Sequence, residues 1–242
     1  MKTLILAISI AAAFSASAVH AEEATYDLTA NASATSDYRY RGISQTRLAP
    51  AVQGGADFTH KATGLYVGTW LSTIKWTKDA GGSGDVEMDI YAGKRGELSD
   101  GISYDVGVLS YLYPSNGLKS VPGFANANTT ELYGQLGYGP AYLKYSHAVT
   151  NLFGYVDSKN SGYLDIGANI DVGQGMTLNL HAGYQGIKNS SADYTDWKVG
   201  VTKDFGFATG SVALVGTNID TFAPNGKNLS DNGLVVTFSK TF

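Results

Sequence analysis

The sequence predicts an all-β protein: a transmembrane antiparallel β-barrel of about 12 strands with short periplasmic turns and long extracellular loops. Three observations lead to this fold class. Apolar and polar residues alternate through many segments of about ten residues. Short and long connections also alternate along the chain, and the last segment ends on an aromatic residue.

Residues 163–172 (YLDIGANIDV) show the alternation most clearly, because every second residue from Leu164 to Val172 is apolar. In a strand, such residues all point to one face of the sheet. Equivalent segments are expected near residues 26–41, 50–60, 64–74, 85–97, 101–113, 130–138, 141–149, 162–172, 176–187, 194–204, 207–217 and 233–242. For residues 64–74, two apolar sets are equally plausible, one built on Leu65 and Val67 and the other on Tyr66 and Trp70.

The connections favour a membrane barrel. Tight turns such as KATG, LSDG and YGPA follow every second strand, and mostly long polar stretches separate the others. In an up-and-down barrel with both termini on one side, all the short turns then lie on that side. A soluble β-sandwich also alternates, but its core prefers large aliphatic residues, whereas the polar face here is dense in Gly, Asn and Thr. Closure of the sheet also removes exposed edge strands.

The N-terminus predicts export. Lys2 precedes a short apolar run, residues 4–13, and the small-x-small pattern of residues 19–21 follows. This is a secretory signal peptide, and we expect residues 1–21 to be cleaved and residues 22–242 to form one barrel domain. The apolar run is too short to be a membrane-spanning helix. The expected location is therefore the outer membrane of a Gram-negative cell, with outer-membrane lipid as a partner.

The C-terminal segment GLVVTFSKTF ends on Phe242, with Leu234, Val236 and Phe238 on the same face. It resembles the terminal strand by which bacterial outer-membrane proteins are recognised, so we expect the barrel-assembly machinery to bind Phe242. Lys240 stands where that pattern usually has an apolar residue, and near the interface its ammonium group can reach the headgroups.

Composition excludes several classes of function. The formal net charge is −4 and no basic patch is evident, which argues against nucleic acid as a partner. There is no cysteine, no zinc-binding spacing and no nucleophile elbow. We therefore expect no catalytic residue, no metal and no cofactor. A barrel hydrolase remains an alternative, because a site built across strands leaves no sequence motif; it requires His181 to lie near a serine or a carboxylate.

The charged residues assigned to the inner wall are the main functional signal. Ten acids and five bases fall on the inward parity. Such groups select permeating ions and solutes. The residues that we expect to line a pore are Asp37, Arg39, Arg41, Glu87, Asp89, Arg95, Asp105, Glu131, Lys144, Asp165, Asp171, His181, Asp196 and Lys198, and the inward acids also include Asp27 and Asp57.

The stretch SDYRYRGISQ, residues 36–45, alternates two tyrosines with two arginines. If the first strand continues to residue 41, its parity places Tyr38 and Tyr40 in an aromatic girdle against lipid. Arg39 and Arg41 then face the outer mouth of the lumen, where a guanidinium can bind a carboxylate through two hydrogen bonds.

Several blocks in order resemble the TorF-type porin family, a group of proteobacterial conserved hypothetical outer-membrane proteins. They are SDYRYRGISQT (residues 36–46), PAVQGGADF (50–58), GLYVGTW (64–70), VEMDIYAG (86–93) and ELYGQLGYGPAYLKYS (131–146). The resemblance implies an outer-membrane, porin-like protein, and it carries over no substrate or catalytic residue.

The function expected from the sequence is passive diffusion of small hydrophilic solutes through a narrow charged lumen. A lumen whose charges pair across strands, and which is plugged, is the competing interpretation. A structural or adhesive barrel that acts through its external loops, and the hydrolase above, are the alternative functions.

Overall fold

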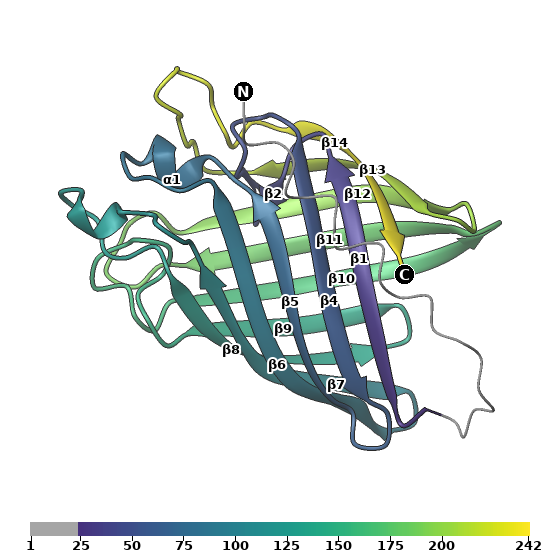
Figure 1. The fold of residues 1–242 in the computed structure, drawn as a ribbon. Coiled ribbons are helices and arrows are strands. Elements are labelled where there is room, and N and C mark those ends of the chain that lie inside the picture. Colours follow the sequence, from purple (N-terminus) through teal and green to yellow (C-terminus); the bar gives the residue numbers. More distant parts are fainter. Residues whose placement is uncertain (1–23) are drawn as a thin grey trace, which may run out of the picture.

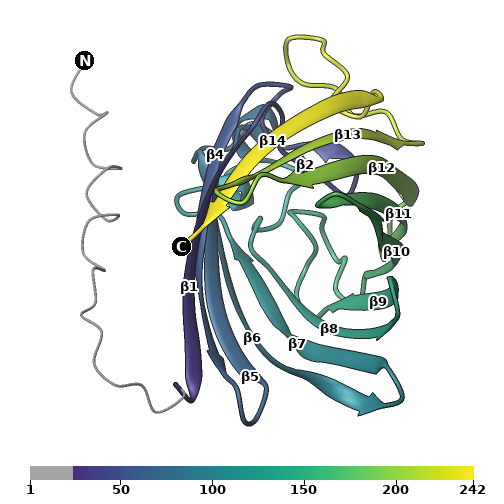
Figure 2. The ribbon, with the colours of Figure 1, turned by 90° about the vertical axis from the view of Figure 1, so that its right-hand side faces the viewer.

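The structure, a computed structural model, describes residues 24–242; the expected signal peptide, residues 1–21, lies outside this range. Twelve strands form one closed antiparallel barrel, in which each strand pairs with the barrel strands before and after it and β1 pairs with β14. Figures 1 and 2 show the barrel from two sides. They are β1 (Tyr26–Thr35), β4 (Ala51–His60), β5 (Leu65–Thr73), β6 (Val86–Ser99), β7 (Ile102–Leu112), β8 (Thr129–Tyr138), β9 (Ala141–Ala148), β10 (Gly162–Gly173), β11 (Met176–Gly186), β12 (Tyr194–Asp204), β13 (Thr209–Thr217) and β14 (Gly233–Thr241). The predicted fold class is confirmed.

The connections differ at the two ends of the barrel. At one end, which we call the turn end, the strands are joined by residues 61–64, 100–101, 139–140, 174–175 and 205–208. The other end, the loop end, carries the long connections, including the short helix α1 (Trp76–Asp79) and the 3-10 helix η1 (Leu118–Ser120) (Figure 1). Strand β1 starts at the turn end and β14 finishes there, as expected for an up-and-down barrel.

The outer wall is apolar. Along β10, Leu164, Ile166, Ile170 and Val172 are exposed, and the other barrel strands carry similar exposed aliphatic residues. The ambiguous segment β5 follows the same rule, because Leu65 and Val67 are exposed outside while Tyr66 is buried inside. An exposed apolar surface that surrounds the whole barrel is far larger than water-soluble monomers carry.

Glycines and tyrosines both lie on the inner wall, where tyrosine rings pack over glycines of adjacent strands. A Cβ on Gly93 would lie 2.4 Å from the Tyr66 hydroxyl, and one on Gly167 would lie 2.5 Å from the Tyr142 hydroxyl. Each ring therefore lies across a glycine of an adjacent strand and fills the space that the glycine leaves. This packing stiffens the wall without a conventional hydrophobic core.

The apolar contacts inside the barrel gather at the loop end. One cluster contains Tyr38, Ile74, Tyr111, Tyr113 and Leu118. A second contains Ala148, Leu152, Ile187 and Tyr194. Both clusters lie beside residues 36–50, the segment that follows β1 and leaves the barrel wall.

The first strand is shorter than predicted, which corrects the expected range of residues 26–41. β1 ends at Thr35, and Ser36 makes the last backbone hydrogen bond that continues the strand pairing, donating its N–H to the Val236 carbonyl at 2.8 Å. Residues 36–50 then turn into the barrel. Within them β2 (Arg39–Tyr40) and β3 (Ile43–Ser44) pair with each other and with no barrel strand. We call residues 36–50 the inserted hairpin; β2 lies within the barrel outline in Figure 2.

Candidate functional site

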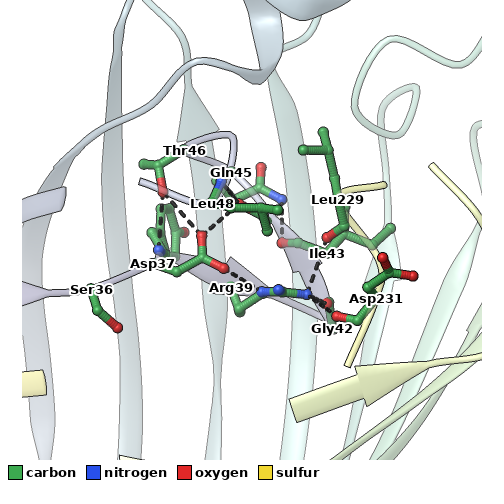
Figure 3. A network of polar contacts seen from close by, with 12 residues as sticks. Ser36, Asp37, Arg39, Gly42, Ile43, Gln45, Thr46, Leu48, Leu229 and Asp231 are labelled. Carbon is green, nitrogen blue, oxygen red and sulfur yellow. Dashed lines mark hydrogen bonds and ion pairs between the residues drawn. The ribbon is translucent and has the colours of Figure 1, made fainter. Parts of the chain in front are cut away.

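The inserted hairpin is organised by Asp37, which lies at its base (Figure 3). The Asp37 carboxylate accepts hydrogen bonds from Ser44 Oγ at 2.5 Å and Thr46 Oγ1 at 3.2 Å, and its other oxygen lies 2.5 Å from Arg39 Nε. The Thr46 hydroxyl also accepts the Tyr38 backbone N–H at 3.1 Å. One carboxylate thus joins both strands of the hairpin. Short polar side chains commonly hold turns in this way.

Arg41 and Gly42 form the tip of the hairpin. Their φ angles are 45° and 83°, and two successive positive values fit the tight turn that joins the paired strands β2 and β3. A Cβ on Gly42 would lie 2.8 Å from the Cβ of Asp196 and 2.9 Å from that of Thr217. Only glycine fits, because the tip presses against the wall at β12 and β13.

Arg41 reaches two further parts of the wall from this tip. Its Nη2 donates to both carboxylate oxygens of Glu131 on β8, at 2.8 and 3.0 Å. Its Nη1 donates to Gln185 on β11 at 2.5 Å, and the guanidinium lies 4.0 Å from the centre of the Tyr163 ring. Burial alone would lower the pKa of Arg41, but the Glu131 carboxylate raises it well above its ordinary value. The expected two-bond contact to a lumen carboxylate is therefore present, as a buried ion pair.

Tyr38 and Tyr40 also point into the barrel, so the predicted position of both in a lipid-facing girdle is wrong. Tyr38 donates its hydroxyl to Glu87 on β6 at 3.1 Å, and the Tyr40 hydroxyl lies 2.6 Å from that of Tyr111 on β7. Burial raises the pKa of both phenols well above the ordinary value, and they remain neutral donors. The parity argument failed because the segment had already left the wall, so both of its faces lie inside.

Arg39 ties the hairpin to the loop of residues 218–232. Besides its contact with Asp37, its Nη1 donates to the backbone carbonyls of Leu229 at 3.1 Å and Asp231 at 2.9 Å (Figure 3). The two arginines therefore do not form the bare basic patch expected at the outer mouth. Each is paired with a carboxylate, and both hold the hairpin in place.

Cavities lie inside the barrel around the hairpin, and three of them are lined by the expected charged residues. The β9–β12 cavity, of about 280 Å³, is lined by Arg39, Arg41, Lys144, Asp165, His181, Asp196 and Lys198, with Tyr40, Gly42, Tyr111, Tyr142, Ser146, Tyr163 and Val215. The β11–β14 cavity, of about 370 Å³, shares Arg39, Lys198 and Val215 with it. The β4–β8 cavity, of about 260 Å³, shares Lys144 with the first and includes Asp57, Arg95 and Asp105. Lys144 and Lys198 thus each line two of these cavities.

His181 lies between two carboxylates. Its Nδ1 is 2.8 Å from Asp165 Oδ1, and its Nε2 is 2.7 Å from Asp196 Oδ1. The hydrolase alternative required a nearby carboxylate, which is present. However, both ring nitrogens face acceptors, so the ring carries a proton on each and has no free lone pair to act as a base. Among residues 24–242, no serine or threonine hydroxyl is a hydrogen-bond partner of this ring.

The remaining expected pore residues occupy different places. Glu87, Asp89 and Glu131 are buried beside the hairpin and line none of the three cavities. Asp105 accepts the Tyr66 hydroxyl in the β4–β8 cavity, where the Arg95 guanidinium lies 5.2 Å from the centre of the Tyr66 ring. Asp171 lies apart from the other expected pore residues. It is exposed at the turn end and accepts the Gly173 backbone N–H at 2.7 Å.

The alternation of residues did not lead us to expect tyrosines among the residues that line the lumen. Tyr66, Tyr91, Tyr133, Tyr142 and Tyr163 line the cavities. Their signal was present in the sequence, because Tyr91 has the parity of Glu87 and Asp89 and Tyr163 has that of Asp165. A tyrosine fits either face of a barrel strand, since its ring is apolar and its hydroxyl is polar.

Comparison with known proteins places the fold among porins. The sequence model of Gcw_chp, described as a bacterial protein of unknown function, matches residues 20–242. The structure resembles the KdgM porin with a TM-score of 0.54 and 7% identity, covering 88% of this chain and 99% of that chain. The corresponding values for the NanC porin are 0.53 and 10%, with 89% and 99% covered. KdgM has also been solved in complex with disordered oligogalacturonate, and that structure gives a TM-score of 0.54 at 7% identity, with 89% and 99% covered.

No curated protein matches the sequence. The described part of the chain contains no helix long and apolar enough to cross a membrane. Within residues 24–242, no group of three or more His, Cys, Asp or Glu side chains is arranged to hold a metal ion.

Proposed function

This chain belongs to the Gcw_chp family of bacterial proteins of unknown function, and we propose that it is a porin of the Gram-negative outer membrane. Small hydrophilic solutes diffuse passively through the narrow bore that the inserted hairpin leaves open. We also propose that the chain is a TorF-type porin, because its sequence contains the blocks given above. The proposal also includes removal of residues 1–21 as a signal peptide.

The outward face supports a membrane location. Exposed leucine, isoleucine, valine and phenylalanine side chains surround the barrel, and every strand has two paired neighbours. A lipid bilayer accommodates both features, because it solvates apolar side chains and requires all backbone groups to be hydrogen-bonded. The exposed Phe242 directly follows β14, which is consistent with recognition by the barrel-assembly machinery.

The single observation that carries the transport proposal is the group of three polar cavities, of which Lys144 and Lys198 each line two. A sealed barrel needs no such space, since its inward side chains can pair directly across the lumen. The KdgM porin, whose fold this chain shares, has been solved with an oligogalacturonate. Hydrophilic solutes in the lumen of this chain are our inference from its own cavities.

Single-channel recording tests the proposal. The purified full-length protein, folded in detergent and added to planar lipid bilayers, is expected to produce discrete conductance steps in potassium chloride. The steps are expected to be smaller than those of open sixteen-strand porins, because the hairpin narrows the bore. Protein that is folded by heat-modifiable gel migration but yields no conductance would overturn the proposal.

A sealed barrel that acts through its loops is the second candidate. The observation in its favour is the pair of apolar clusters around the hairpin at the loop end. The same recording separates the two functions, since a sealed barrel gives no conductance at any voltage.

A further inference from the structure

The inserted hairpin covers one side of the inner wall more completely than the other. The inward residues of the covered side are acidic, and those of the uncovered side include the two lysines that each line two cavities. We propose that the accessible lumen prefers small hydrophilic anions, because the hairpin removes the acidic strip from contact with solutes. This inference rests on the proposed porin function and assigns its class of solute.

The acidic strip consists of Glu87, Asp89 and Glu131 on β6 and β8. These side chains belong to residues that are 1%, 8% and 2% exposed. Tyr38 of the hairpin donates to Glu87, and Arg41 neutralises Glu131 through two hydrogen bonds. A solute in any of the three cavities meets none of these carboxylates.

The β9–β12 cavity is lined by more basic than acidic side chains. Lys144 and Lys198 of the wall line it together with Arg39 and Arg41 of the hairpin, and the two arginines are paired with Asp37 and Glu131, which do not line it. Its two carboxylates, Asp165 and Asp196, both face the ring of His181, which carries a proton on each nitrogen. Negative charge in this cavity is therefore largely compensated locally, within a hydrogen-bonded group.

Lys144 and Lys198 are the cations left without a carboxylate partner. Within residues 24–242, neither ammonium group takes part in an ion pair within 4.0 Å. The Lys144 Nζ lies 4.3 Å from the centre of the Tyr133 ring, a contact that leaves its charge in place. A cation that is outside any ion pair and lies beside a narrow passage attracts anions and repels cations over several ångströms.

Their positions make these lysines selective. A solute passing from the β4–β8 cavity to the β9–β12 cavity passes Lys144, and one continuing to the β11–β14 cavity passes Lys198. Counting inward residues by parity gives ten acids and five bases, which predicts a preference for cations. The three cavities are instead lined by five acids and five bases, with His181 in addition, so the hairpin removes the excess of acids that a solute can reach.

Reversal potentials in a potassium chloride gradient test the inference. The wild-type protein is expected to favour chloride over potassium. Lys144→Gln and Lys198→Gln are each expected to reduce the chloride-to-potassium permeability ratio about two- to fivefold. Lys119→Gln is the matched control, since Lys119 is an exposed residue of η1 that lines none of the cavities.

Arg41→Ala tests the covering role of the hairpin. This substitution frees the Glu131 carboxylate and loosens the tip of the hairpin. The chloride-to-potassium permeability ratio is therefore expected to fall below that of the wild type, while the conductance rises. A wild-type channel that prefers potassium would overturn the inference and leave the porin function standing. The same holds if the chloride-to-potassium permeability ratio is unchanged in both lysine variants. Absence of conductance from folded wild-type protein would instead refute the porin function itself.

Discussion

Gly42 carries the strictest requirement of any residue in the inserted hairpin. It combines a left-handed backbone with a wall contact that leaves no room for a Cβ. The tip of the hairpin can reach Glu131 and Gln185 only while Gly42 lies against β12 and β13. The identity of one residue therefore determines where Arg41 places its charge.

Gly42→Ala is expected to destabilise the protein by about 1–3 kcal/mol, because alanine is strained at positive φ and its methyl group collides with the wall. Urea unfolding in detergent measures the change. Gly226→Ala is the matched control: Gly226 has a φ of 79° in the loop of residues 218–232, and nothing lies within 4 Å of its Cβ position. An equal loss of stability in both variants would mean that backbone strain alone, and not the wall contact, explains the effect.

The hairpin as an element is separable from the barrel. Strands β1 and β4 pair over ten positions, from Tyr26 opposite His60 to Thr35 opposite Ala51. The ends of the two strands are thus already adjacent, and a short turn can join them. The hairpin is an insertion at this junction, and apart from Ser36, which is hydrogen-bonded to Val236 of β14, it contributes no backbone pairing to the closure of the barrel.

Replacing residues 36–50 with a short Asn-Gly turn is expected to leave the barrel folded and to increase its single-channel conductance several-fold, because the bore loses its constriction. Planar bilayer recording gives the conductance, and circular dichroism confirms the strand content. If the folded variant conducts no more than the wild type, the constriction lies elsewhere in the lumen.

The sequence predicted the barrel strands well because alternation is a local property that survives in the fold. β10 and β12 lie within a residue of their expected bounds. The hairpin was not predicted, since Tyr-Arg-Tyr-Arg alternates equally well in a wall strand and in an inserted one. What separates the two is pairing: Ser36 makes the last backbone hydrogen bond to β14, and Asp37 then binds Ser44 and Thr46. Such contacts between distant residues leave no periodic signal.

The same limit applies to the candidate site. Glu131 and Lys198 have inward parity and lie inside the barrel, and Arg41 lies inside because the whole hairpin does, but parity could not show which charges pair. Pairing depends on the depth of the hairpin tip, which is determined by the close contact at Gly42. The balance of accessible charge is therefore a property of the three-dimensional structure, although each contributing residue can be read from the sequence.

At the scale of the whole molecule, the junction of β1 and β14 is the weakest part of the wall. These strands pair at five positions, from Asn31 opposite Thr241 to Thr35 opposite Thr237, half as many as β1 and β4. Two further backbone hydrogen bonds join Ala30 and Phe242, at 2.8 and 3.2 Å. The last residue of the chain thus helps to close the barrel through its backbone, while its exposed ring remains free for another role.

Phe242→Ala separates these two roles, because alanine keeps both backbone hydrogen bonds and loses the ring. In detergent, the variant is expected to unfold within about 0.5 kcal/mol of the wild type, as surface substitutions generally do. In cells, the amount assembled in the outer membrane is expected to fall several-fold if the proposed recognition by the assembly machinery depends on this aromatic ring. Phe238→Ala is the control, because Phe238 lies on the same strand and is similarly exposed. Heat-modifiable migration of outer-membrane fractions measures assembly, and equal amounts of Phe242→Ala and wild-type barrel would refute a role for the terminal ring.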